Sequence, residues 1–219
     1  RITNSWQLTL CMLLDLLQMC AFWLEAGYFD VASHEKWLLH TWSLSVEWQF
    51  YLLLPIAVFA VWWLLPYRWA LVVTVAVALV GSFLLSTIMT PRTPSAAFFL
   101  LPTRVWELLA GVLVYLVSDR VHLSMRVRRW LEVAGLALIA LALVVFDEQT
   151  AWPGSAALVP VMGTALVLLA MRHTPGWATP QAVQWVGRSS YSLYLWHWPA
   201  FVALVYLDLQ GEALAVGVA

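Results

Sequence analysis

Residues Leu38 to Pro55 read LLHTWSLSVEWQFYLLLP, an apolar run that carries a row of polar side chains. The row consists of His40, Ser43, Glu47 and Tyr51. This spacing places all four on one side of an α-helix. Inserting an ionisable residue at the centre of a bilayer costs about 2.5–3.5 kcal/mol, so such residues usually serve a function. The run therefore predicts a helix whose polar side faces other helices or a water-filled cavity.

The composition predicts a membrane protein. The 219 residues are 63% hydrophobic and only 11% charged, whereas soluble domains have about 25% charged residues. The apolar runs are also much longer than the strands of about ten residues that build membrane β-barrels. We expect an all-α, polytopic transmembrane helix bundle.

Seven segments are long enough to cross a bilayer, which takes about 20 residues. They lie near 5–24, 41–65, 69–89, 98–118, 130–146, 155–171 and 187–208. Turns rich in Pro and Gly separate them, and no linker predicts a domain boundary. We expect one membrane domain over residues 1–219. The chain opens at Arg1 close to a membrane segment and ends where another begins, so we expect a domain truncated at both ends.

The basic residues predict an orientation. Eight Lys or Arg residues lie in the termini and loops on the side of Arg1, and only Lys36 and Arg92 lie on the other side. Because basic loops stay in the cytoplasm, the side of Arg1 is predicted to be cytoplasmic. His40 then lies at the outer end of its helix. Glu47 lies roughly 10 Å deeper, too far for a direct hydrogen bond between the two side chains.

A second polar row begins in the segment near 98–118, with Arg104, Glu107, Gly111 and Tyr115 at the same spacing as the first. Two interpretations stay open. Arg104 and Glu107, three residues apart, can pair with each other and serve the fold alone. Alternatively, Arg104 offers a guanidinium group to a phosphate or carboxylate.

His197 is the third candidate, in the sequence SSYSLYLWHWPAF. Pro199 removes the helical partner of the Leu195 carbonyl, and such a break within a membrane must be satisfied by protein or water. A packed, hydrogen-bonded histidine and a functional histidine both fit this pattern. Cys11 and Cys20 fall on opposite sides of one helix, and no metal-ligand spacing occurs. We therefore expect no metal and no bound cofactor.

Several blocks carry a resemblance to a known family. They are HTWSLSVEWQFYLLLP at 40–55, LLPTRVWELLAGVL at 100–113, WPGSAALVPVMGTALVLLA at 152–170 and VGRSSYSLYLWHWPAF at 186–201. In this order they resemble the acyltransferase 3 family of membrane O-acyltransferases, whose acceptors include lipopolysaccharide, peptidoglycan, exopolysaccharide and macrolides.

The resemblance implies a bundle of about ten helices. It implies an acyl-CoA donor, most often acetyl-CoA, and a glycan or glycolipid acceptor at a bacterial inner membrane, with no nucleic acid partner. It gives functional positions to Glu47, Arg104, Glu107 and His197. We add His40 as a second candidate base, with hydroxyl donors from Ser43, Tyr51, Tyr191 and Tyr194. The oligomeric state is not predicted.

The chain departs from the family at two places. Trp48 stands where many relatives have a second Glu, and the family's catalytic His, which follows an Arg or Lys in the first helix, has no counterpart. We therefore expect this stretch to be inactive alone. The resemblance also bears on orientation, because relatives with a fused extracytoplasmic domain would place the side of Arg1 outside.

Two rival functions remain open. The first is a transporter or flippase, in which the intramembrane Glu, Arg and His form a relay. The second is a non-catalytic scaffold that Arg104 and Glu107 hold together.

Overall fold

The computed structural model describes residues 41–147, 150–170 and 180–206. Its helices, in chain order, are α2 (Trp42–Leu64), α3 (Arg68–Met89), α4 (Pro94–Phe99), α5 (Leu101–Ser118), α6 (Met125–Val145), α7 (Leu158–Ala170) and α8 (Gln181–Tyr206). These described ranges contain no strand, so the all-helical prediction is confirmed.

Within the described ranges, three helical stretches are long and apolar enough to cross a membrane: α2, α3, and the span Pro94–Ser118 that contains α4 and α5. Much of their apolar surface is not covered by other parts of the protein. On α2, Phe59 is 72% exposed and Trp63 is 77% exposed. Exposed apolar surface of this extent indicates contact with lipid. The other four spans stay predictions. The one near 5–24 lies outside the described residues, and α7 has only 13 residues.

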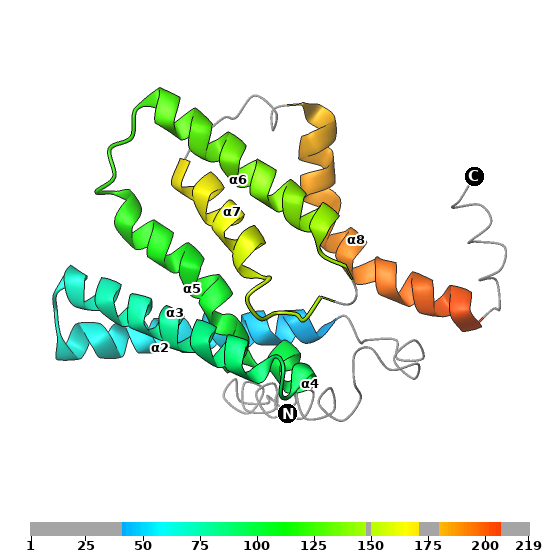
Figure 1. The fold of residues 1–219 in the computed structure, drawn as a ribbon, viewed down its shortest axis with the longest axis horizontal. Coiled ribbons are helices and arrows are strands. Elements are labelled where there is room, and N and C mark those ends of the chain that lie inside the picture. The colour runs from blue at the N-terminus through cyan, green and yellow to red at the C-terminus, as the bar shows by residue number, and fades with distance from the viewer. Residues whose placement is uncertain (1–40, 148–149, 171–179, 207–219) are drawn as a thin grey trace, which may run out of the picture. The chain divides into compact units, whose positions relative to one another are not determined.

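Residues 46–173 form one compact unit, in which four helices lie in a row. α3 packs against α5, α5 against α7, and α7 against α6 (Figure 1). Phe50 of α2 joins this unit by packing with Val75 of α3 and Leu109 of α5 in a buried apolar cluster. The cluster therefore packs α2 and α3 against α5, the helix that carries Arg104 and Glu107.

The contact between α6 and α7 is closest at two glycines. A Cβ atom at Gly135 would lie 2.5 Å from the carbonyl oxygen of Gly163, and a Cβ at Gly163 would lie 2.7 Å from the carbonyl oxygen of Gly135. Small residues let helix backbones approach in this way inside membranes. Arg128 adds a polar link, because its guanidinium donates to the carbonyl of Ala170 at 2.8 Å, at the end of α7. α6 and α7 therefore form a tightly joined pair.

The helical backbone is interrupted at Leu100, between α4 and α5, where the backbone is extended (φ −81°, ψ 138°). The hydroxyl of Thr103 donates to the carbonyls of Ala97 and Leu100, both at 2.8 Å. Thr103 is fully buried. A helix break at membrane depth is tolerated only where the protein satisfies the freed backbone groups. The span predicted near 98–118 is therefore present, within Pro94–Ser118, and the structure adds a break at Leu100 that the sequence did not predict.

Ser82 ties α3 to the first turns of α5. Its hydroxyl donates to the Pro102 carbonyl at 2.6 Å and accepts from the backbone N–H of Trp106 at 3.1 Å. These two backbone groups are four residues apart, the separation that an α-helix bridges by itself. A side chain placed between them bends a helix or fixes its start. Ser82 therefore positions the turn that carries Arg104.

One of the Pro- and Gly-rich turns expected between segments is present at Trp152–Gly154 and leads into α7. Gly154 has a φ of +32°, a region that favours glycine. Its N–H donates to the Thr90 hydroxyl at 3.1 Å, and that hydroxyl donates to the Ser86 carbonyl at 2.7 Å. The end of α3 thereby holds the turn in place.

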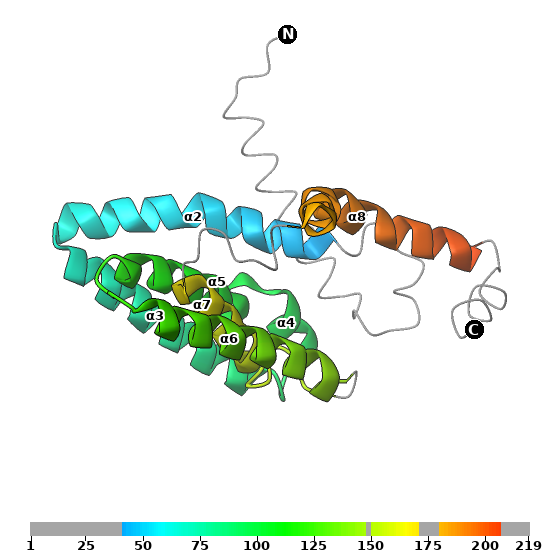
Figure 2. The same ribbon diagram turned by 90° about the horizontal axis from the view of Figure 1, so that it is seen from above.

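A second unit contains α8 and the first turn of α2. α8 runs through Pro199 without ending there. Val202, on the following turn, is fully buried. Figure 1 shows α8 as one continuous helix with a bend between its first turns and the rest, and Figure 2 shows it from above.

Candidate active site

Arg104 is held in one position at the start of α5. Its Nε donates to the Phe98 carbonyl at 2.9 Å, and its guanidinium carbon lies 4.7 Å from the centre of the Phe98 ring. One terminal nitrogen lies 3.3 Å from Oε2 of Glu107. The Arg104 side chain is only 14% exposed. The pairing allowed by the three-residue spacing is therefore formed, and it lies directly after the helix break.

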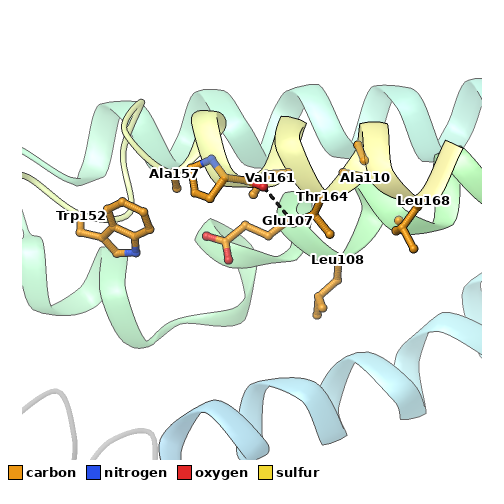
Figure 3. Close-up of a pocket in the computed structure, with 11 residues that line it drawn as sticks. Glu107, Leu108, Ala110, Trp152, Ala157, Val161, Thr164 and Leu168 are labelled. Carbon is orange, nitrogen blue, oxygen red and sulfur yellow. Dashed lines mark hydrogen bonds between the residues drawn. The ribbon is translucent and has the colours of Figure 1, made fainter. Parts of the chain in front are cut away.

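Glu107 uses only one of its two carboxylate oxygens in this pair. Oε1 is buried and has no hydrogen-bond partner among the residues that the structure describes. A buried acceptor without a partner is costly, which in a native protein calls for an explanation such as a ligand or water. Glu107 borders a pocket of about 410 Å³ between α5, α7 and the turn before α7. Figure 3 shows the carboxylate on the same side of the pocket as Trp152.

The walls of this pocket are almost entirely apolar. They include Leu108 of α5, Trp152 of the turn, and Val161 and Leu168 of α7. Thr164 adds a hydroxyl, which donates to the Pro160 carbonyl at 2.9 Å. A mostly apolar cavity with a few polar groups, in the range of about 300–1,000 Å³, is typical of small-molecule sites. The sequence motif contained Glu107, but only the folded chain brings α7 opposite it.

A separate group of polar side chains lies in the unit that contains α8. The hydroxyls of Ser43 and Tyr194 lie 2.6 Å apart. His197 places Nδ1 2.5 Å from the Tyr194 carbonyl oxygen, and its ring centre lies 5.5 Å from that of Tyr194. Three of the predicted site residues are therefore brought together here. Both hydroxyls and the imidazole can donate or accept a proton.

The remaining candidates are not joined to either group by a described contact. Glu47 is half-buried on α2, and no described residue pairs with its carboxylate. Tyr51 and Tyr191 are 58% and 60% exposed. His40 lies outside the described residues. In the described ranges, no group of His, Cys, Asp and Glu could hold a metal ion.

The sequence model of an acyltransferase domain, that of the acyltransferase 3 family, matches residues 2–213. The chain belongs to the acyltransferase 3 family. This match covers nearly every residue, so the resemblance carried by the four sequence blocks is confirmed.

Among curated proteins, the peptidoglycan O-acetyltransferase OatA of Listeria monocytogenes is 28% identical to the chain over 191 residues. The match covers 80% of the chain and 30% of OatA. The O-acetyltransferase OatA of Staphylococcus aureus is 25% identical over 201 residues, covering 86% of the chain and 33% of that protein. The chain thus spans about a third of the length of these relatives. No solved structure matches it.

Proposed function

We propose that the protein is a membrane O-acyltransferase that moves an acyl group, usually acetyl, from acyl-CoA to a sugar hydroxyl of a cell-envelope or exported glycan. We place it in a bacterial inner membrane with several spans, in a single acyltransferase domain over residues 1–219. The observation that carries this proposal is the family match over residues 2–213. The relatives named as peptidoglycan or O-acetyltransferases support the choice of a glycan acceptor.

The chemistry requires a base and oxyanion donors from the protein. The thioester C–S bond breaks, a C–O ester bond forms, and the hydroxyl proton ends on the thiol. A base must take that proton, and donors must stabilise the oxyanion of the tetrahedral intermediate. Polar residues inside an otherwise apolar bundle can supply both in a low-dielectric setting.

We assign these roles to the residues that the sequence singled out. Glu47, His40 and His197 are the candidate base or base-orienting groups. Arg104 is the candidate for binding phosphate or developing negative charge, since the bonds to Phe98 and Glu107 hold its guanidinium fork in place. The Ser43–Tyr194 hydroxyl pair is the candidate proton donor to an oxyanion.

One experiment tests the proposal. The full-length protein is prepared in membrane vesicles, acetyl-CoA labelled in the acetyl group is added, and label is followed into glycan. We expect label that mild alkali releases, because it is held as an ester. Glycan that crosses the membrane without gaining label would contradict acyl transfer and favour the transporter.

A further inference from the structure

The pocket beside Glu107 is larger than an acetyl group requires. Its volume is about 410 Å³. Along α7 it is lined from Pro160 to Leu168, a distance of about 12 Å at 1.5 Å per residue. Among the described residues that line the pocket, only Glu107 is charged, and the walls beyond it are apolar apart from the Thr164 hydroxyl (Figure 3). A ligand that fits this shape is a chain, polar at one end and aliphatic along the rest.

Small residues on α5 and α7 leave the pocket its volume. Ala110 and Gly111 of α5 line the pocket opposite Ala165 of α7. A Cβ atom at Gly111 would meet no other atom within 4 Å. A side chain added there would therefore enter the pocket without displacing the protein.

The Glu107 end of the pocket favours a ligand whose hydrogen-bond donor is a neutral group. Arg104 already balances the charge of Glu107 through Oε2, so a cationic head is not required. Oε1 still lacks a partner among the described residues and can accept a hydrogen bond from a neutral N–H or O–H. The arm of coenzyme A carries such an amide N–H a few bonds away from the thioester sulfur. A free aliphatic chain of a membrane lipid carries none along its length.

We propose that this pocket holds the acyl chain of the donor thioester, with Gly111 setting the longest chain accepted, so that the enzyme transfers acyl groups longer than acetyl. This inference rests on the proposed function and adds a chain-length determinant to it. The reaction is unchanged: the thioester C–S bond breaks, the glycan ester C–O bond forms, and the hydroxyl proton goes to the thiol.

The test compares acetyl-CoA with octanoyl-CoA as donors for the full-length protein in vesicles. We expect the unmodified protein to transfer both groups. Gly111→Leu should lower octanoyl transfer at least about tenfold, since each methylene that loses its place in an apolar pocket is worth about 10–200-fold. Acetyl transfer should change less than about twofold. Gly81→Leu is the matched control, because a Cβ there also meets no atom within 4 Å and Gly81 lies on α3, away from the pocket.

A second measurement detects the chain directly. Octanoyl-CoA with a photoreactive diazirine at the chain end should label peptides that contain Leu108 or Leu168, and Gly111→Leu should abolish that labelling. Equal labelling by the diazirine octanoic acid alone would show a lipid chain in the pocket and overturn the inference.

The two proposals fail in different ways. Acetyl transfer with neither octanoyl transfer nor labelling would refute the chain pocket and leave the acyltransferase standing. Labelling at Leu108 or Leu168 without transfer from either donor would support the pocket and refute the proposed reaction.

Discussion

The hydroxyl oxygens of Ser43 and Tyr194 lie 2.6 Å apart, although 151 positions separate the two residues in the chain. Ser43 lies in the first turn of α2, and Tyr194 lies in α8 one turn before His197. Each residue had been singled out in its own polar motif. The hydrogen bond makes the two motifs parts of one arrangement.

Tyr194→Phe removes only a hydroxyl. We expect acetyl transfer by the full-length protein to fall about tenfold, because the loss of one hydrogen bond of roughly 1.4 kcal/mol changes a rate by that factor. Ser43→Ala should give a similar loss, and the double variant little more, since the two hydroxyls act as a pair. Tyr67→Phe, at an exposed tyrosine stacked on Trp69, serves as the control. Full activity in Tyr194→Phe would remove this pair from the site.

The Arg104–Glu107 pair can be tested for structural and functional roles separately. Arg104→Met alone leaves a buried carboxylate, and we expect it to cost about 3 kcal/mol of unfolding free energy. Adding Glu107→Met should restore most of that stability, because apolar residues often replace a buried pair without loss. The double variant should unfold at nearly the normal temperature and yet lose acyl transfer. A stable and active double variant would mean that the pair serves the fold alone.

Thr103→Val tests the helix break. The two side chains have similar volume, but valine cannot donate to the Ala97 and Leu100 carbonyls. We expect the unfolding free energy to fall by about 1–3 kcal/mol, since buried acceptors lose their partner. Thr87→Val is the control, because its hydroxyl bonds the Leu84 carbonyl on an exposed part of α3. Thermal unfolding in detergent measures both variants, and equal midpoints would disprove the role given to Thr103.

Gly135→Ala tests the α6–α7 contact. Its Cβ would lie 2.5 Å from a backbone oxygen of Gly163, so the helices must separate. Overpacking of this kind costs about 1–3 kcal/mol. Gly81→Ala meets nothing within 4 Å and should leave stability unchanged or improve it by up to about 1 kcal/mol. The same unfolding assay decides, and a Gly135→Ala protein as stable as Gly81→Ala would refute the close approach.

Local patterns predicted the helices well. The apolar runs near 41–65 and 69–89 correspond to α2 and α3 within a few residues. The start of the span near 130–146 was predicted less well, because α6 begins at Met125, where Ser124 caps it. The basic residues that follow Ser124 were expected in a loop, but the cap draws them into the helix.

Tertiary relationships were beyond the sequence patterns. The break at Leu100 depends on the Thr103 side chain replacing helical bonds, and Ser82 reaches it from another helix. The pocket depends on α7 lying opposite Gly111 and Glu107. Neither follows from the periodicity of a single segment, because periodicity defines a face and not its partner.

The measurement that tests the proposed acyl transfer most directly is labelled acetyl transfer by the full-length protein carrying Glu47→Gln. This change keeps the size of the side chain and removes its charge. We predict a loss of at least about 100-fold, as expected for a proton-transfer group, with protein levels unchanged. Asp119→Asn, the same chemical change in an exposed pair with Arg68, should keep normal activity. Undiminished transfer in Glu47→Gln would contradict the account.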